Sequence, residues 1–246
     1  MSDWTIYPYS KFSARLNMAI DHSLASRFSP DSLPVLRFYG WVPHAITIGF
    51  HQNKDAFNPD KIHESGIDFA RRPTGGRAIF HGNELTYAII HPLSLNKTEL
   101  YRMSHMAFID AFKELGFDLD YQRKQIDLNA AYKQNDSYSC FANSAQFEVS
   151  LQQEKVIGSA QRVYSHSILQ HGSIMISDDY LKLANFVQTK YDLMQSATFI
   201  DLHSKNKQLD DLIKACKKAL RHHFSIDRYI ENTYSPDLHN LVEFVE

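Results

Sequence analysis

The sequence predicts a single α+β domain, residues 1–246, with a largely antiparallel or mixed sheet. Three observations predict this class: an amphipathic helical pattern near the N-terminus, three successive strand-like segments in the middle, and helical patterns in the last third. No repeat, low-complexity segment or Pro/Gly/Ser-rich linker divides the chain.

The first helix is predicted from the spacing of Phe12, Leu16, Ala19, Ile20 and Leu24, and the turn-rich SPDSLP that follows ends it. The apolar segments VLRFYGW and AITIGF predict two strands separated by a turn, and IDFARR predicts a third. LTYAIIHP reads as a buried strand.

A second helix is predicted over residues 99–115, where Gly116 marks its end. The polar segment 121–139 fits no element. Residues 146–151, 154–164 and 167–176 alternate like three antiparallel strands, with a turn around QQE between the first two. Residues 178–187, 208–224 and 235–246 are helix candidates.

Composition excludes several classes of protein. Lys and Arg total 26 against 28 Asp and Glu, so the formal charge of −2 gives no reason to expect nucleic-acid binding. No apolar stretch is long enough to span a bilayer, and the N-terminus lacks the pattern of a signal peptide. We therefore expect a cytoplasmic protein with no membrane partner.

The thirteen histidines form neither HExxH nor a tight His/Cys cluster, so we expect no metal site. The two cysteines have no CxxC spacing. Cys216 lies on the apolar face of a predicted helix and is expected in the core. Cys140 lies at a transition from loop to strand, where a thiol is either a buried small hydrophobe or a nucleophile.

The segment RRPTGGR holds adjacent glycines between arginines and leads from one predicted strand to the next. Gly75 and Gly76 permit a tight hairpin turn, or the close approach of main-chain N–H groups to a ligand. With Arg71, Arg72 and Arg77 beside them, the second alternative is an anion or carbonyl site. The pattern matches neither a Walker A loop nor GxGxxG.

Two further segments carry candidate site residues. Lys155 is either a solvated lysine at a strand edge or an ammonium that stabilises an oxyanion, and Gly158, Ser159 and Ala160 let a ligand lie against the backbone. His171, beside Gly172 in an apolar strand, is either a satisfied core histidine or a site residue.

The blocks NMAID, RFYGW, RRPTGGRAIFHGNELTYAI, SCFANSAQFEV, EKVIGSAQR and LQHGSIMI, taken together and in this order, resemble the lipoate-protein ligase and octanoyltransferase superfamily. The resemblance covers about residues 4–190. It implies a curved mixed sheet flanked by helices, a fold related to biotin-protein ligases, and the handling of a medium-chain acyl group and a lysine of a lipoyl carrier domain.

Two chemistries occur in that superfamily. Ligases activate free lipoate with ATP and Mg²⁺, whereas the transferases take octanoyl from a thioester on acyl carrier protein and need no such cofactor. The sequence is more similar to the cysteine-dependent octanoyltransferases, because Arg77 stands where ligases have a third glycine and Cys140-Phe141 stands where those transferases carry their nucleophile. The residues after Lys190 are also few for the extra domain of many ligases.

The resemblance implies roles for the residues that match its blocks. Cys140 would attack the octanoyl thioester, and the lysine of the carrier would attack the resulting acyl-enzyme. Lys155 and the main-chain N–H groups near the glycine pair would hold the carbonyl oxygen. The remaining candidate substrate-binding residues are Arg72, Thr74, Arg77, His81, Gly158, Ser159, Ala160, His171 and Gly172.

The implied partners are octanoyl-acyl carrier protein and a lipoyl domain such as the glycine-cleavage carrier. Three alternatives stay open: an ATP-dependent ligase, an amidotransferase that moves octanoyl between two lipoyl-bearing proteins, and a non-catalytic module that binds a carrier protein. The base that activates Cys140 is also open, with His81 and His171 as candidates.

Overall fold

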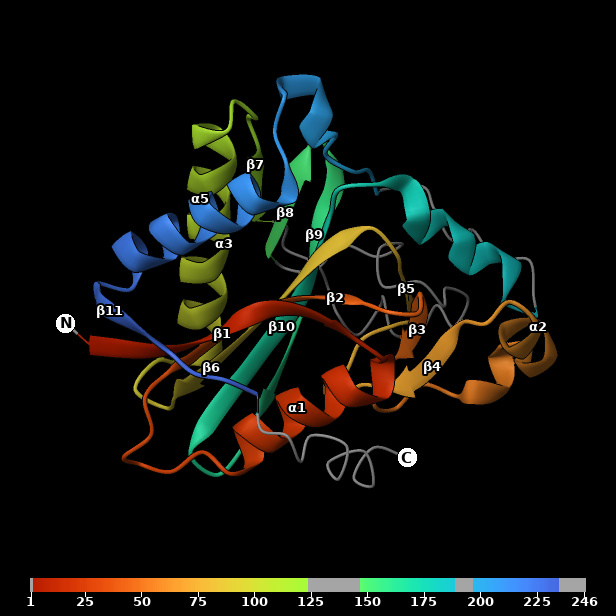
Figure 1. Cartoon of the computed structure of the whole chain (residues 1–246), viewed down its shortest axis with the longest axis horizontal. Coiled ribbons are helices and arrows are strands. Elements are labelled where there is room, and N and C mark those ends of the chain that lie inside the picture. The colour runs from red at the N-terminus through yellow and green to blue at the C-terminus, as the bar shows by residue number, and fades with distance from the viewer. Residues whose placement is uncertain (1, 124–146, 189–196, 235–246) are drawn as a thin grey trace.

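A mixed sheet of eight strands forms the centre of the computed structural model, which describes residues 2–123, 147–188 and 197–234 (Figure 1). Strand β1 is parallel to both of its neighbours, and the other pairs are antiparallel. The strands in spatial order are β11 (Ile226–Glu231), β1 (Ser2–Phe12), β2 (Val35–Trp41), β6 (Glu84–Pro92), β10 (Ser167–Met175), β9 (Glu154–Val163), β8 (Phe147–Leu151) and β7 (Asp120–Arg123). The predicted α+β class with a mixed, largely antiparallel sheet is confirmed.

A second sheet of three short strands carries the arginine and glycine motif. Strand β3 (Ala45–Ile48) lies between β4 (Asp68–Arg71), to which it is parallel, and β5 (Ile79–His81), to which it is antiparallel. The segment from Arg72 to Ala78 connects β4 to β5, so the motif lies between strands as its sequence indicates.

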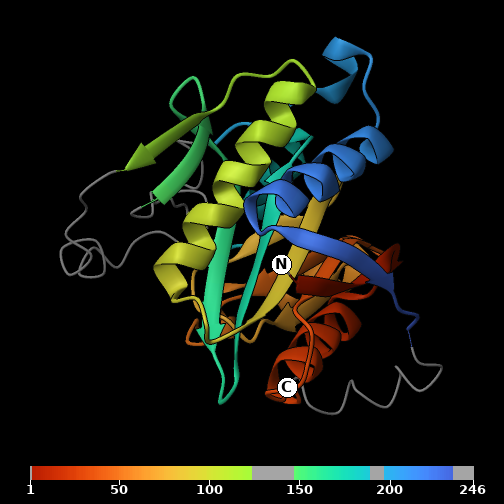
Figure 2. The same cartoon turned by 90° about the vertical axis from the view of Figure 1, so that its left-hand side faces the viewer.

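Helices cover both faces of the large sheet (Figures 1 and 2). Helix α1 (Ala14–Ser26) packs on one face, and α3 (Lys97–Glu114) and α5 (Leu209–His223) pack together on the other. The ends of these helices follow from local sequence: the Ser13 side chain caps α1, and Asn96 and Glu99 form a capping box at the start of α3. The shorter helices are α2 (Pro59–Glu64) and 3₁₀ turns at Lys54–Ala56, Asp178–Asn185 and Leu202–Lys205.

Alternation along the central strands decides which side chains reach which face. Leu36 and Phe38 of β2 belong to the core under α3 and α5, whereas Val35, Tyr39 and Trp41 point to the side of α1. The side chains of β6 and β10 alternate between the same two faces. The polar clusters around Asp21 and Glu84, described below, lie on the α1 side, where the small sheet also packs.

Several elements differ from the predictions. Strands β1 and β11 were not predicted, and Phe12, expected in the first helix, ends β1. Residues 178–187, expected as a helix, form a 3₁₀ turn at Asp178–Asn185, whose cap is the Ser177 hydroxyl. The predicted helix at 235–246 and most of the unassigned segment 121–139 lie outside the described residues.

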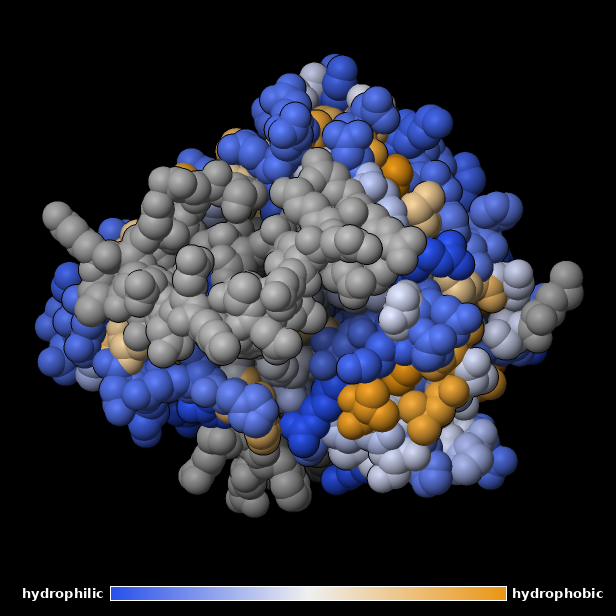
Figure 3. Space-filling view, turned by 180° about the vertical axis from the view of Figure 1, so that it is seen from behind, coloured by the Kyte–Doolittle hydropathy of each residue, from blue (hydrophilic) through white to orange (hydrophobic). Residues whose placement is uncertain are grey.

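The described surface is largely hydrophilic when seen from behind, and the most prominent group of hydrophobic residues forms a patch on it (Figure 3). Among the residues that the structure describes, no helix has the length and apolar character needed to cross a membrane.

Candidate active site

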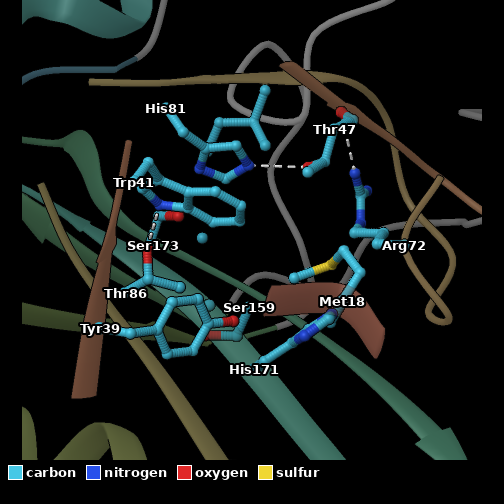
Figure 4. Close-up of a pocket in the computed structure, with 14 residues that line it drawn as sticks. Met18, Tyr39, Trp41, Thr47, Arg72, His81, Thr86, Ser159, His171 and Ser173 are labelled. Atoms are coloured by element: carbon cyan, nitrogen blue, oxygen red, sulfur yellow. Dashed lines mark hydrogen bonds between the residues drawn. The ribbon is translucent and has the colours of Figure 1, made fainter. Parts of the chain in front are cut away.

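A pocket opens on the α1 side of the large sheet, next to the small sheet (Figure 4). Its wall combines apolar and aromatic side chains with hydroxyl and imidazole groups, a composition typical of small-molecule sites. The lining residues are Met18, Tyr39, Trp41, Thr47, Arg72, Ile79, His81, Thr86, Gly158, Ser159, Ala160, His171, Gly172 and Ser173.

One side of the pocket is organised around the buried carboxylate of Glu84, at the start of β6. Its Oε1 accepts hydrogen bonds from His81 Nδ1 at 2.9 Å and from Ser173 Oγ at 2.6 Å. It also accepts from Trp41 Nε1 at 3.2 Å and from Thr86 Oγ1 at 2.6 Å. Oε2 has no hydrogen-bond partner among the described residues.

His81 continues this cluster into the small sheet. Because Glu84 accepts from Nδ1, Nε2 of the neutral ring accepts the hydroxyl proton of Thr47 at 2.7 Å. Burial lowers the pKa of His81, although the carboxylate of Glu84 opposes that shift. The imidazole therefore lies in the pocket as a neutral group at physiological pH.

The opposite side of the pocket is organised around Asp21 of α1. Its Oδ2 accepts from His171 Nδ1 at 2.9 Å and from the Tyr39 hydroxyl at 2.8 Å, and its Oδ1 pairs with the Arg37 guanidinium. The other ring nitrogen of His171, Nε2, lies 2.6 Å from Thr74 Oγ1. Burial alone would raise the pKa of Asp21, but Arg37 and the hydrogen bonds from His171 and Tyr39 hold it below its ordinary value.

The arginines of the motif bind the protein's own main chain. Arg72 donates from Nε and Nη2 to the Gly75 carbonyl and from Nη2 to the Arg77 carbonyl, which folds the loop around its guanidinium. Arg71 donates to the carbonyls of Gly49, Phe50 and Gln52 in the loop after β3. Both guanidinium groups thus bind main-chain carbonyl groups and stabilise loops beside the pocket. They do not by themselves form the expected anion or carbonyl site.

The glycine loop packs tightly against the loop after β3. Gly76 has a φ of +94°, a conformation that favours glycine. A Cβ on Gly49 would lie 1.8 Å from the Gly76 carbonyl oxygen, so this contact also requires glycine at position 49. Around Gly75 the space is open, since a Cβ there would meet no heavy atom within 4 Å.

Strand β9 supplies the small residues of the third wall. Ser159 Oγ lies 2.6 Å from the Tyr87 hydroxyl and 2.9 Å from His105 Nε2 of α3. Burial, together with the charge of Lys155, lowers the pKa of His105 to about 3, so this ring is neutral.

The structure brings together most of the predicted site residues. Arg72, His81, Gly158, Ser159, Ala160, His171 and Gly172 line the pocket; Thr74 binds His171; and Gly75, Gly76 and Arg77 form the adjoining loop.

Two candidates stand apart from that group, and the second cysteine was expected in the core. Lys155 is 5% exposed, so it is not the solvated edge lysine considered above; it lies near His105 rather than among the lining residues. Cys140 lies outside the described residues. Cys216 is fully buried among apolar side chains of the core, as expected.

Sequence reasoning missed the acids Asp21 and Glu84 and the partners Thr47 and Trp41. A signal was present, because Asp21 follows Ile20 within an apolar helical pattern and Glu84 begins an otherwise apolar strand. Acids at such positions are buried only when they are paired.

Comparison with known proteins identifies relatives that cover most of the chain. Residues 13–231 match the model of the lipoyl protein ligase A/B catalytic domain. The chain is 37% identical over 195 residues to "Octanoyltransferase LipM" of Lysinibacillus sphaericus, covering 74% of this chain and 69% of that protein. It is 36% identical over 188 residues to the protein of the same name from Bacillus subtilis, covering 73% and 68%.

Solved structures show the same fold. The chain resembles lipoate-protein ligase A bound with ATP, with a TM-score of 0.79 at 18% identity, covering 99% of this chain and 94% of that one. It also resembles a structure from Thermoplasma acidophilum described as a bi-partite lipoate protein ligase and its E2 lipoyl domain, with a TM-score of 0.74 at 18% identity, covering 99% and 92%. The family match and the relatives confirm the resemblance found in the sequence: the chain belongs to the lipoyl protein ligase A/B catalytic domain family.

Proposed function

We propose that this protein is an octanoyltransferase, which moves an octanoyl group from the thioester of acyl carrier protein to a lysine of a lipoyl domain. The observation that carries this proposal is the similarity to relatives named octanoyltransferase, at 37% identity over 74% of the chain. An apolar pocket with a few fixed polar groups on the family's fold is consistent with a medium-chain acyl substrate.

The reaction proceeds in two steps of thiol chemistry. The Cys140 thiolate attacks the thioester carbonyl and a new carbon–sulfur bond forms. The carbon–sulfur bond to the carrier breaks, and the carrier leaves as a thiolate that takes up the proton lost by Cys140. The lysine amine of the lipoyl domain then attacks the acyl-enzyme. An amide bond forms, the bond to Cys140 breaks, and the amine proton passes to the thiolate. A thioester is already activated, so neither step consumes ATP.

The acyl chain occupies the pocket between the two sheets. Trp41, Tyr39, Met18 and Ile79 supply apolar surface, and the small residues of β9 leave room against the backbone. His81 is neutral, which suits a substrate whose acyl group carries no charge.

The developing oxyanion is held by Lys155 and by main-chain N–H groups at Gly75 and Gly76. Burial of Lys155 supports this role, because a charge in a site of low dielectric constant stabilises an oxyanion more strongly than a solvated one. The acyl acceptor is a lipoyl domain such as the glycine-cleavage carrier, which presents its lysine after acyl carrier protein has left.

Intact mass after incubation with octanoyl-acyl carrier protein, without ATP, tests the proposal. Wild type should gain one octanoyl group and lose it when a lipoyl domain is added. Cys140→Ala should gain none. Cys216→Ala is the matched control: it removes the other cysteine, which is buried in the core, and should be acylated like wild type.

A different outcome of the same experiment would identify an ATP-dependent ligase. If wild type stays unmodified, yet ATP with free octanoate or lipoate modifies the lipoyl domain and Cys140→Ala retains that activity, the protein is a ligase and the proposal fails.

A further inference from the structure

A continuous series of buried polar groups connects the face of the large sheet to the glycine loop. Arg37 of β2 pairs with Asp21 of α1, Asp21 binds His171 of β10, and His171 binds Thr74 in the loop. All four residues are at most 5% exposed. The groups come from four separate parts of the chain and converge on the loop that carries Gly75 and Gly76.

The chemistry of the groups fixes the direction of the hydrogen bonds. Arg37 is always a donor, and the ionised carboxylate of Asp21 only accepts, so His171 donates its Nδ1 proton to Asp21. In a neutral ring, that proton on Nδ1 leaves Nε2 as an acceptor for the hydroxyl proton of Thr74. The tautomer of His171 is therefore set by Asp21, and it sets the orientation of the Thr74 side chain.

The main chain around Thr74 is oriented as well. The Thr74 carbonyl accepts from Phe50 N–H at 2.9 Å, and the Gly75 carbonyl accepts from Arg72 Nη2 at 2.8 Å. In a planar trans peptide the N–H points opposite to the C=O. The N–H groups of Gly75 and Gly76 therefore point away from Phe50 and from the Arg72 guanidinium, and neither has an acceptor among the described residues.

We propose that Asp21 is a positioning residue for acyl transfer: acting through His171 and Thr74, it holds the Gly75 and Gly76 N–H groups in the orientation that receives the carbonyl oxygen of the substrate. The inference rests on the proposed octanoyl transfer. Preorganised donors of this kind act because they need no reorientation as the charge develops.

This role differs from that of an ordinary core ion pair. A buried pair alone adds little stability compared with apolar residues of the same shape. Here the pair extends through a pocket-lining histidine to the loop, so its loss should alter catalysis beyond its effect on folding.

A double-mutant cycle tests the proposal. The variants are Asp21→Asn, Thr74→Val and the double variant, and the readouts are kcat and KM for octanoyl transfer to a lipoyl domain. Each single change should lower kcat about tenfold or more while KM changes less than about twofold, because ground-state binding of the acyl chain is untouched. The double variant should be no slower than the slower single variant.

Two controls accompany the cycle. Thr74→Ser keeps the hydroxyl and should retain most of the wild-type kcat. Asp110→Asn breaks another carboxylate–histidine contact, 2.6 Å from Asp110 to His223 on the outer helices, and should leave kcat unchanged. Independent, multiplicative losses for Asp21→Asn and Thr74→Val would overturn the proposal.

Nitrogen-15 NMR of the wild-type protein gives a second readout that does not depend on whether Asp21→Asn folds. The His171 signals, assigned by comparison with His171→Gln, should show the proton on Nδ1 in the neutral ring. A proton on Nε2 would overturn the proposed series of hydrogen bonds from Asp21 through His171 to Thr74, even if octanoyl transfer is confirmed. Conversely, a wild-type protein that forms no acyl-enzyme refutes the proposed octanoyl transfer. The tautomer of His171 still tests the hydrogen bonds to Asp21 and Thr74 independently of that result.

Discussion

His81 lies flat against Trp41, with ring centroids 3.8 Å apart and an interplanar angle of 20°, and both rings donate to the same oxygen of Glu84. The carboxylate thus fixes two walls of the pocket that come from different sheets. Removing the acceptor should leave several buried donors unpaired at once.

Glu84→Ala should lower the free energy of unfolding by about 3 kcal/mol or more, because each buried donor left without an acceptor costs about 1–3 kcal/mol. Glu84→Gln should cost only about 1 kcal/mol, since its amide oxygen can take the place of Oε1. Urea denaturation of the two variants measures the difference. Equal losses for both would show that the negative charge, rather than the acceptor, holds the cluster.

Acid should destabilise the protein through His105. Its pKa is about 3 in the folded state against 6.5 as the ordinary value, so the unfolded chain binds more protons between these limits. This contribution to stability is complete above about pH 6.5 and is lost progressively as the pH falls towards 3. From pH 7.5 to 5 the loss from this group is about 2 kcal/mol, at 1.36 kcal/mol for each pH unit below the unfolded pKa.

His105→Gln should flatten that dependence by about the same 2 kcal/mol. The measurement is the free energy of unfolding from denaturant titrations at several pH values. His166→Gln, a change at an exposed histidine, is the control and should leave the slope as in wild type. An unchanged slope in His105→Gln would contradict the burial of a neutral imidazole at this position.

Gly49→Ala should destabilise the protein strongly, by more than about 2 kcal/mol, because the new Cβ would lie 1.8 Å from the Gly76 carbonyl oxygen and one loop must move. Gly75→Ala introduces the same methyl group into open space and should change the free energy of unfolding by less than about 0.5 kcal/mol. Thermal unfolding of the pair is the test. Similar melting temperatures would mean that the two loops are not in contact.

Cys216 should resist thiol reagents in the native protein, because its side chain is fully buried and burial raises the pKa of its thiol. Peptide mapping after brief treatment with iodoacetamide should find Cys216 unmodified, and the same treatment in denaturant should modify it. Rapid native labelling of Cys216 would show that α5 opens readily from the core.

The sequence predicts elements best where burial is continuous. Strands β2 and β6 are almost entirely buried, and their unbroken apolar runs are recognisable. Strand β11 has one buried residue, Ile226, and exposed polar positions, and β1 buries only Trp4 and Ile6. The pairing of β1 with β11 on one side and with β2 on the other is a long-range effect that no local sequence pattern predicts.

The same distinction applies to the site: residues of one local motif were predicted, and residues that depend on long-range contacts were not. The motif predicts Arg72, Thr74 and His81 because they lie together in one stretch. Asp21 and Glu84 were missed since their role depends on partners far away in sequence: Asp21 binds His171 across 150 positions, and Glu84 binds Ser173 across 89. Arg71 and Arg72 look like ligand-binding residues in sequence, and only the folded chain shows that they hold carbonyl groups of neighbouring loops.

The pairing of β1 with β11 has a consequence for how the protein is made. Ser2 lies beside Ile226, so the ribosome completes β11 long after β1 has emerged. Until then the outer edge of β1 presents unpaired main-chain groups, which can pair with other chains. Contacts between such distant segments also slow folding, because loop closure must precede them. We therefore expect folding rate and recovery at high protein concentration to depend on β11 more strongly than its small share of the core suggests.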